Sequence, residues 1–156
     1  MSVAARLAEL GLVLPPPAPP KGTYSPSRRC GDQLWVSGAT ARRDGSPALR
    51  GVVGADVTVD DARAQAATAA LNLLGAVEAA AGLDAVAAIV HLRGYVRATT
   101  EFDAHPAVVD GASAVLIDVF GERIGAHART AIGVASLPGG ACVELELVVS
   151  LAGVGG

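Results

Sequence analysis

The residues best suited to chemistry lie near the carboxyl end of the chain. Residues 127–138 read as a strand that carries Arg129, and the strand after it carries Glu144 and Glu146. Side chains alternate along a strand, so the two glutamates share one face. A Pro-Gly-Gly turn at 138–140 predicts that the two strands form a hairpin. An arginine that clamps a carboxylate, with a carboxylate nearby to handle a proton or a water, predicts a small-molecule site.

Arg129 suits a carboxylate ligand because its guanidinium stays charged and presents a planar fork. Ala131 and Gly133 follow on the same strand face and leave room beside it for a ligand. The alternative interpretation is a salt bridge to a neighbouring glutamate. A partly buried Glu144 would have a raised pKa and exchange a proton near neutrality, whereas on a solvated strand face it would not.

Three further residues are candidates for the walls of such a site. Tyr24 follows Gly22 on an extended segment, so that its hydroxyl could cap a pocket. Ser37 and Gly38 stand at the end of a predicted strand and offer a hydroxyl and an open backbone amide.

The elements that must position these residues follow from spacing and from start and stop signals. The predicted elements, in chain order, are a helix over 2–11 capped by Ser2, a Pro-rich arm over 14–20, a strand over 33–38, a hairpin at Asp44-Gly45 with a return strand over 48–53, a helix from the cap Thr58 to Gly82, a strand over 87–98 and a helix from Pro106 to Phe120. The two C-terminal strands complete the set. Residues 1–21 are predicted to form a helix and arm, and residues 22–156 a single domain.

This order predicts an α+β fold, a mixed sheet with two helices on one face. In the first long helix the predicted inward positions are Ala62, Ala66, Ala69, Leu73, Val77 and Ala80. In the strand over 87–98 the pattern predicts that the apolar Val90, Leu92 and Val96 share one face, with His91, Arg93, Tyr95 and Arg97 on the other. Because neither face of the strands is polar throughout, we expect the open face of the sheet to be covered by self-association.

Composition excludes several functional classes. The net charge is −3 and aromatic residues make up 3% of the chain, which argues against a nucleic-acid surface. The only lysine is Lys21, in the Pro-rich arm, so a Schiff-base enzyme is not expected. His91, His105 and His127 lie too far apart for a local metal motif, and no metal or cofactor is expected.

The chain also lacks the signals of secretion and of membrane insertion. The first 14 residues include Arg6 and Glu9, and no apolar run is long enough to span a membrane. Cys30 and Cys142 belong to no CxxC pair. We therefore expect a cytoplasmic protein with two reduced thiols and no membrane partner.

Taken together, the motifs resemble those of the reactive-intermediate deaminases, the RidA or YjgF-like family. The motifs that carry the resemblance are Tyr24 in the arm, Val36-Ser37-Gly38, residues 51–54, the Ala-rich helix ending at Gly82-Leu83, His127-Ala128-Arg129 with Leu137-Pro138, and residues 143–146. Residues 111–122 are similar to a divergent branch of the family with a longer N-terminal extension.

The resemblance implies a chorismate-mutase-like fold and a homotrimer with clefts between subunits. It implies hydrolysis of 2-imino or enamine acids to 2-keto acids and ammonia, without a cofactor. Arg129 would hold the carboxylate of the substrate and Glu144 would position water. Tyr24, Ser37 and Gly38 would complete the substrate-binding cleft with Ala131.

Two positions depart from the pattern of the deaminases. Ala131 stands where they usually carry cysteine, and Ala39 follows Ser37-Gly38 where they carry glutamine. Two alternatives to the deaminase therefore remain at the level of sequence. One is a non-catalytic protein that binds a small carboxylate or other metabolite in the same clefts, and the other is an endoribonuclease that inhibits translation.

Overall fold

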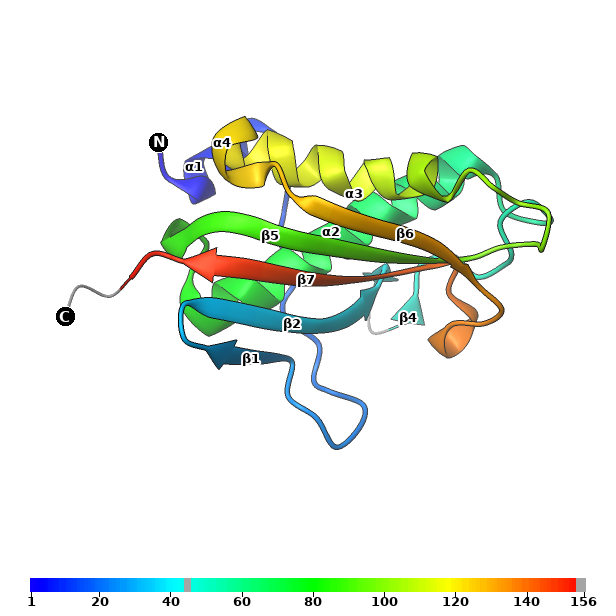
Figure 1. The fold of residues 1–156 in the computed structure, drawn as a ribbon, viewed down its shortest axis with the longest axis horizontal. Helices are drawn as coiled ribbons and strands as arrows, with labels where there is room; N and C mark the ends of the chain where they lie inside the picture. The colour runs from blue at the N-terminus through cyan, green and yellow to red at the C-terminus, as the bar shows by residue number, and fades with distance from the viewer. Residues whose placement is uncertain (44–45, 154–156) are drawn as a thin grey trace.

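A mixed five-stranded sheet carries its helices on one face (Figure 1). The computed structural model describes residues 1–43 and 46–153. Its elements, in chain order, are α1 (Val3–Glu9), β1 (Ser27–Cys30), β2 (Gln33–Thr40), β3 (Arg42–Arg43), β4 (Ser46–Pro47), α2 (Val59–Ala81), η1 (Leu83–Ala85), β5 (Val86–Arg97), α3 (His105–Phe120), α4 (Glu122–Gly125), β6 (Ala128–Val134), η2 (Pro138–Gly140) and β7 (Val143–Leu151). The prediction of an α+β fold with a mixed sheet is confirmed.

The order of the strands across the sheet is β1-β2-β7-β5-β6. Strands β5 and β6 are parallel, and every other neighbouring pair in this sheet is antiparallel. Helix α3 makes the crossover that a parallel pair requires. Helices α2 and α3 pack side by side behind the sheet, and Figure 1 shows both on the same side of it.

The predicted hairpin between the two C-terminal strands is wrong. Strand β5 lies between β6 and β7, so they share no hydrogen bonds. The turn at η2 instead carries the chain from β6, at the edge of the sheet, back to the position between β2 and β5 that β7 occupies. Two glycines with positive φ, Gly139 (65°) and Gly140 (74°), allow this change of direction.

The helix signals of the sequence are largely confirmed. Ser2 caps α1 by accepting a hydrogen bond from the amide of Ala5, and Thr58 caps α2 by accepting one from Asp61. All the predicted inward positions of α2 are buried except Ala80, which is exposed in the last turn. Residues 78–80 are all exposed, so the helical periodicity does not correspond to burial in this turn.

Two strand predictions need correction. Residues 48–53 form no strand, because only Arg50 and Val53 make isolated bridges here, Arg50 to Ala141 and Val53 to Val57 and Ala98. The Asp44-Gly45 hairpin signal lies outside the described residues. Val90 does not face the core, because the register of β5 shifts between Ile89 and His91 and the buried side chain is that of Ile89.

The close approach of α2 and α3 depends on Gly111. A Cβ atom at this position would overlap the backbone carbonyl of Arg63 on α2, which cannot move aside as a side chain can. Replacing glycine by alanine in a helix normally stabilises it by about 1 kcal/mol. Overpacking typically costs about 1–3 kcal/mol. This cost outweighs the gain in helix propensity, so the substitution is destabilising here.

We therefore expect Gly111→Ala to lower the melting temperature by about 2–8 °C, measured by calorimetry. Ala114→Gly, at an exposed position of the same helix, is the control for helix propensity alone. A rise in melting temperature for Gly111→Ala would contradict the close packing of α2 on α3.

Candidate functional site

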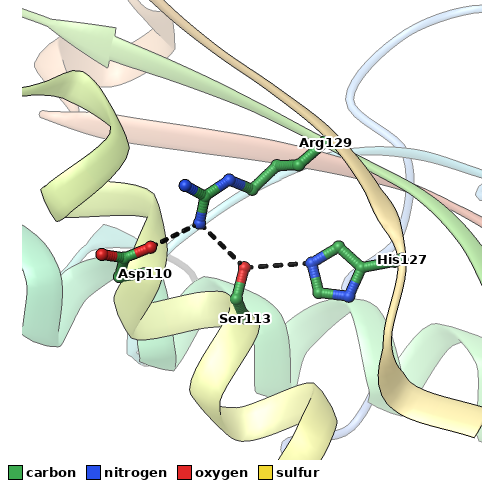
Figure 2. A network of polar contacts seen from close by, with 4 residues as sticks. All are labelled: Asp110, Ser113, His127 and Arg129. Carbon is green, nitrogen blue, oxygen red and sulfur yellow. Dashed lines mark hydrogen bonds and ion pairs between the residues drawn. The ribbon is translucent and has the colours of Figure 1, made fainter. Parts of the chain in front are cut away.

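Arg129 projects from the edge strand β6 toward helix α3. It pairs in register with Leu92 of β5, whose buried side chain faces the helices, so the Arg129 side chain lies on that face too. Figure 2 shows its Nη1 atom between the Oδ1 atom of Asp110, at 2.6 Å, and the Oγ atom of Ser113, at 3.0 Å. The ion pair is therefore with an aspartate on α3 and not with a glutamate on the neighbouring strand.

A second set of hydrogen bonds holds Ser113. Its Oγ atom lies 3.0 Å from Nε2 of His127, and Nδ1 of His127 lies 2.6 Å from the carbonyl oxygen of Gly125 (Figure 2). A carbonyl only accepts, so Nδ1 carries a proton. In the neutral ring Nε2 then accepts the hydroxyl proton of Ser113, which leaves the Ser113 oxygen to accept from Arg129.

The strand face beyond Arg129 carries the small residues noted in the sequence, Ala131 and Gly133. Ala131 pairs with Gly94 and lies on the same face as Arg129. Gly133 follows, and the imidazole of His105 lies over it, so close that a Cβ atom there would meet Nε2 at 2.5 Å. Next to Arg129, this face of β6 therefore carries the Ala131 methyl group and then Gly133, which the His105 ring of α3 covers.

Glu144 lies on the opposite face of the sheet. Its neighbour Leu145 packs against the helix side, so Glu144 points to the open face, where it is paired in register with Tyr95. Partial burial raises the pKa of the Glu144 carboxyl, and the nearby charge of Glu146 raises it further, while Arg42 opposes both. Such a carboxyl is able to exchange protons closer to neutrality than an exposed glutamate.

Gly38 lies directly against this carboxyl. The register between β2 and β7 shifts between Val36 and Ala39, and a Cβ atom on residue 38 would overlap Oε1 of Glu144. The absence of a side chain at Gly38 therefore gives the Glu144 carboxylate its place over the backbone of β2.

We expect Gly38→Ala to fold but to displace the Glu144 carboxylate. Any activity that uses this carboxylate should fall by about tenfold or more, because small errors in the position of a reacting group are costly. Steady-state kinetics together with a melting curve measure this. Unchanged turnover in a normally folded variant would contradict the role given to this contact.

Tyr24, Ser37 and Gly38 border one cavity of about 640 Å³ between the Pro-rich arm, strand β2 and helix α2. The Ser37 hydroxyl donates to the carbonyl oxygen of Ser25 at 2.7 Å, and the Ser37 amide donates to that of Pro26. Ser37 therefore anchors the loop that carries Tyr24, whose side chain is half exposed. The Ser37 hydroxyl proton is used for the bond to Ser25, and the Ser37 oxygen stays able to accept a hydrogen bond.

One chain does not bring the two halves of the predicted site together. Arg129 is on β6 and Glu144 on β7, with β5 between them, so their strands are about 10 Å apart. The two side chains also point to opposite faces of the sheet. The sequence-based expectation that they lie near each other rested on the incorrect hairpin.

Sequence reasoning missed Asp110 and Ser113. The signal was present, because these are the two polar residues, three apart, among the mostly buried apolar positions 108–116 of α3. Within residues 1–43 and 46–153, no group of three or more His, Cys, Asp or Glu side chains is arranged to hold a metal ion. The helices of the described part include none that is long and apolar enough to cross a membrane.

A known protein family matches most of the chain. Residues 4–151 match the family described as YjgF/chorismate mutase-like, putative endoribonuclease, and the chain belongs to this family. It is 41% identical over 150 residues to Protein TCP17 of Trypanosoma cruzi, covering 96% of this chain and 94% of that protein.

Solved structures show the same similarity. The Agrobacterium tumefaciens protein Atu1372, of unknown function, is 38% identical with a TM-score of 0.88, over 96% of this chain and 92% of that one. RidA from an Antarctic Psychrobacter is 25% identical with a TM-score of 0.58, over 87% and 94% of the two chains. The predicted resemblance to RidA and YjgF-like proteins is confirmed.

Proposed function

We propose that this protein hydrolyses reactive 2-imino and enamine acids to 2-keto acids and ammonia, without a cofactor, in clefts between subunits. The observation that carries the proposal is the Glu144 carboxyl, which lies over Gly38 with a pKa raised by burial. Arg129 would hold the substrate carboxylate. The family and the similarity to a RidA structure support the same reading.

The proposed reaction needs only water and a proton acceptor. Glu144 takes a proton from water as the water oxygen adds to the imine carbon, and this proton then goes to the imine nitrogen. In the resulting carbinolamine the nitrogen takes up the hydroxyl proton as the C–N bond breaks, which releases ammonia and leaves a 2-keto acid. Because an imine carbon is already electrophilic, a positioned water and base suffice.

The separation of Arg129 from Glu144 supports a site made by two copies of the chain. Arg129 lies on one edge strand and the cavity beside Tyr24 lies at the other side of the sheet, so one copy can offer its β6 edge to the β2 side of the next. Large apolar side chains on the open face, Trp35 at 51% and Ile132 at 45% exposed, suit a covered surface.

We expect a homotrimer, because both faces of the strands carry apolar residues and the family resemblance implies three copies; a head-to-tail contact that closes into a ring would join them. Light scattering of the purified protein should give three times the 15.5 kDa chain mass at micromolar concentration. A monomer under these conditions would contradict both the assembly and the shared site.

The test of function is release of ammonia and 2-keto acid from imines generated in place by an amino-acid oxidase. The protein should accelerate release above the rate in buffer across a panel of small and bulky imines. No acceleration, with 2-keto acid binding retained, would instead identify a carboxylate-binding protein. Labelled single-stranded RNA, incubated at physiological salt, should stay intact, and cleavage lost in Arg129→Ala would favour the endoribonuclease.

We propose that this protein is cytoplasmic. Cys30 is exposed and Cys142 is buried, and both are free thiols, which suits a reducing compartment.

A further inference from the structure

The guanidinium of Arg129 is held from one side only. Its Nη1 atom donates to both Asp110 and Ser113, whereas Nε and Nη2 make no hydrogen bond with any residue in the described part of the chain. Nε–H and one Nη2–H are parallel and form one fork of the guanidinium. That fork is the edge opposite Asp110 in Figure 2.

With the His127 ring neutral, the hydrogen bonds behind Nη1 have one direction. The Gly125 carbonyl accepts from Nδ1 of His127, Nε2 of His127 accepts from Ser113, and the Ser113 oxygen accepts from Arg129. Each hydrogen bond in the network then joins one donor to one acceptor, and no two donors or two acceptors face each other. The network therefore fixes the position of Nη1 and also limits rotation of the guanidinium about its Nε–Cζ bond.

We propose that Asp110, Ser113 and His127 are positioning residues that hold Nη1 of Arg129, so that its Nε–Nη2 edge receives a ligand carboxylate side-on. This inference rests on the proposed function for the identity of the ligand. The three residues do not touch the ligand, and they act through Arg129. They come from α3 and from the segment before β6, and the crossover brings them to the arginine.

A purely structural role explains the network poorly. In the single chain the Arg129 side chain is 24% exposed and that of Asp110 is 48% exposed, and a partly exposed ion pair contributes little to stability. A pre-oriented fork, in contrast, saves the cost of ordering a long side chain when a ligand binds. The arrangement thus affects binding more than folding.

Ser113 allows a matched test, because Ser113→Thr and Ser113→Val are nearly the same in shape and differ in the hydroxyl. The probe is 2-ketobutyrate, with its amide as the uncharged control, measured by calorimetry. Ser113→Val should weaken binding of the acid by about threefold to tenfold, whereas Ser113→Thr should stay within about twofold of the wild type. Binding of the amide should change little in either variant. Equal affinities of the two variants for the acid would overturn the proposal.

A second measurement does not depend on the ligand. In the ligand-free protein, ¹⁵N spectra of the arginine side chains should resolve the Nη signals of Arg129 in the wild type and in Ser113→Thr, and these should merge in Ser113→Val. Unchanged signals in Ser113→Val would overturn the positioning role. If the wild type shows fixed signals but binds no 2-keto acid, the proposed function fails and the ligand assigned to this edge is wrong, while the positioning of Arg129 stands.

Discussion

Glu144→Gln should lower the rate of imine hydrolysis by about 100-fold or more, while affinity for 2-keto acids stays within about threefold. Glutamine keeps the shape of the side chain over Gly38, but it accepts no proton from water. The expected loss is therefore in kcat, with little change in the binding of product. Coupled assays for turnover and calorimetry for binding separate the two. A variant that retains more than half of the wild-type turnover would rule out Glu144 as the base.

The pH profile gives this prediction an internal control. In the proposed reaction the ionised form of Glu144 is the base, so activity should rise with pH through the pKa of this carboxyl, which burial and Glu146 place above the ordinary value for glutamate. Glu146→Gln removes the like charge and should shift the acid limb to lower pH. A shift to higher pH, or an acid limb at the ordinary position for glutamate in the wild type, would contradict the assignment.

Arg129→Lys should weaken the binding of 2-keto acids by about tenfold or more. An ammonium group is a point charge and does not reproduce the two parallel N–H donors of a guanidinium. In this protein the shorter side chain also stays within reach of Asp110, whose carboxylate would compete for the charge. Calorimetric titration with 2-ketobutyrate measures the loss.

Arg123→Lys is the matched control, because Arg123 is exposed on α4 and its replacement should leave binding unchanged. Equal effects of the two substitutions would mean that Arg129 contributes only general positive charge. Full affinity in Arg129→Lys would show that the carboxylate is bound elsewhere.

The sequence was most informative where structure is local. The caps at Ser2 and Thr58 and the alanine periodicity of α2 predict helices, because a helix is specified by residues three and four apart. The alternation in β5 predicts a strand, but it does not reveal the register shift at Ile89, which depends on the partner strand.

The site was harder to predict, because its parts meet through long-range pairing. A turn rich in proline and glycine between two strands favours a hairpin. No residue near the turn indicates that β5 lies between β6 and β7 in the sheet. For the same reason the sequence did not place Asp110 and Ser113 beside Arg129. The residue types were identified as candidates, whereas their relation to one another required the fold.

The central claim, that each site takes its arginine from one copy and its glutamate from the next, has a direct test. Arg129→Ala and Glu144→Gln are each expected to be inactive. They should be co-expressed with different tags, and the assemblies that carry both tags should be purified and assayed. In a ring of three that carries both tags, one cleft in three receives both wild-type residues, so about one third of wild-type activity should return. Activity no higher than that of the two parents would show that the residues act within one chain or not at all.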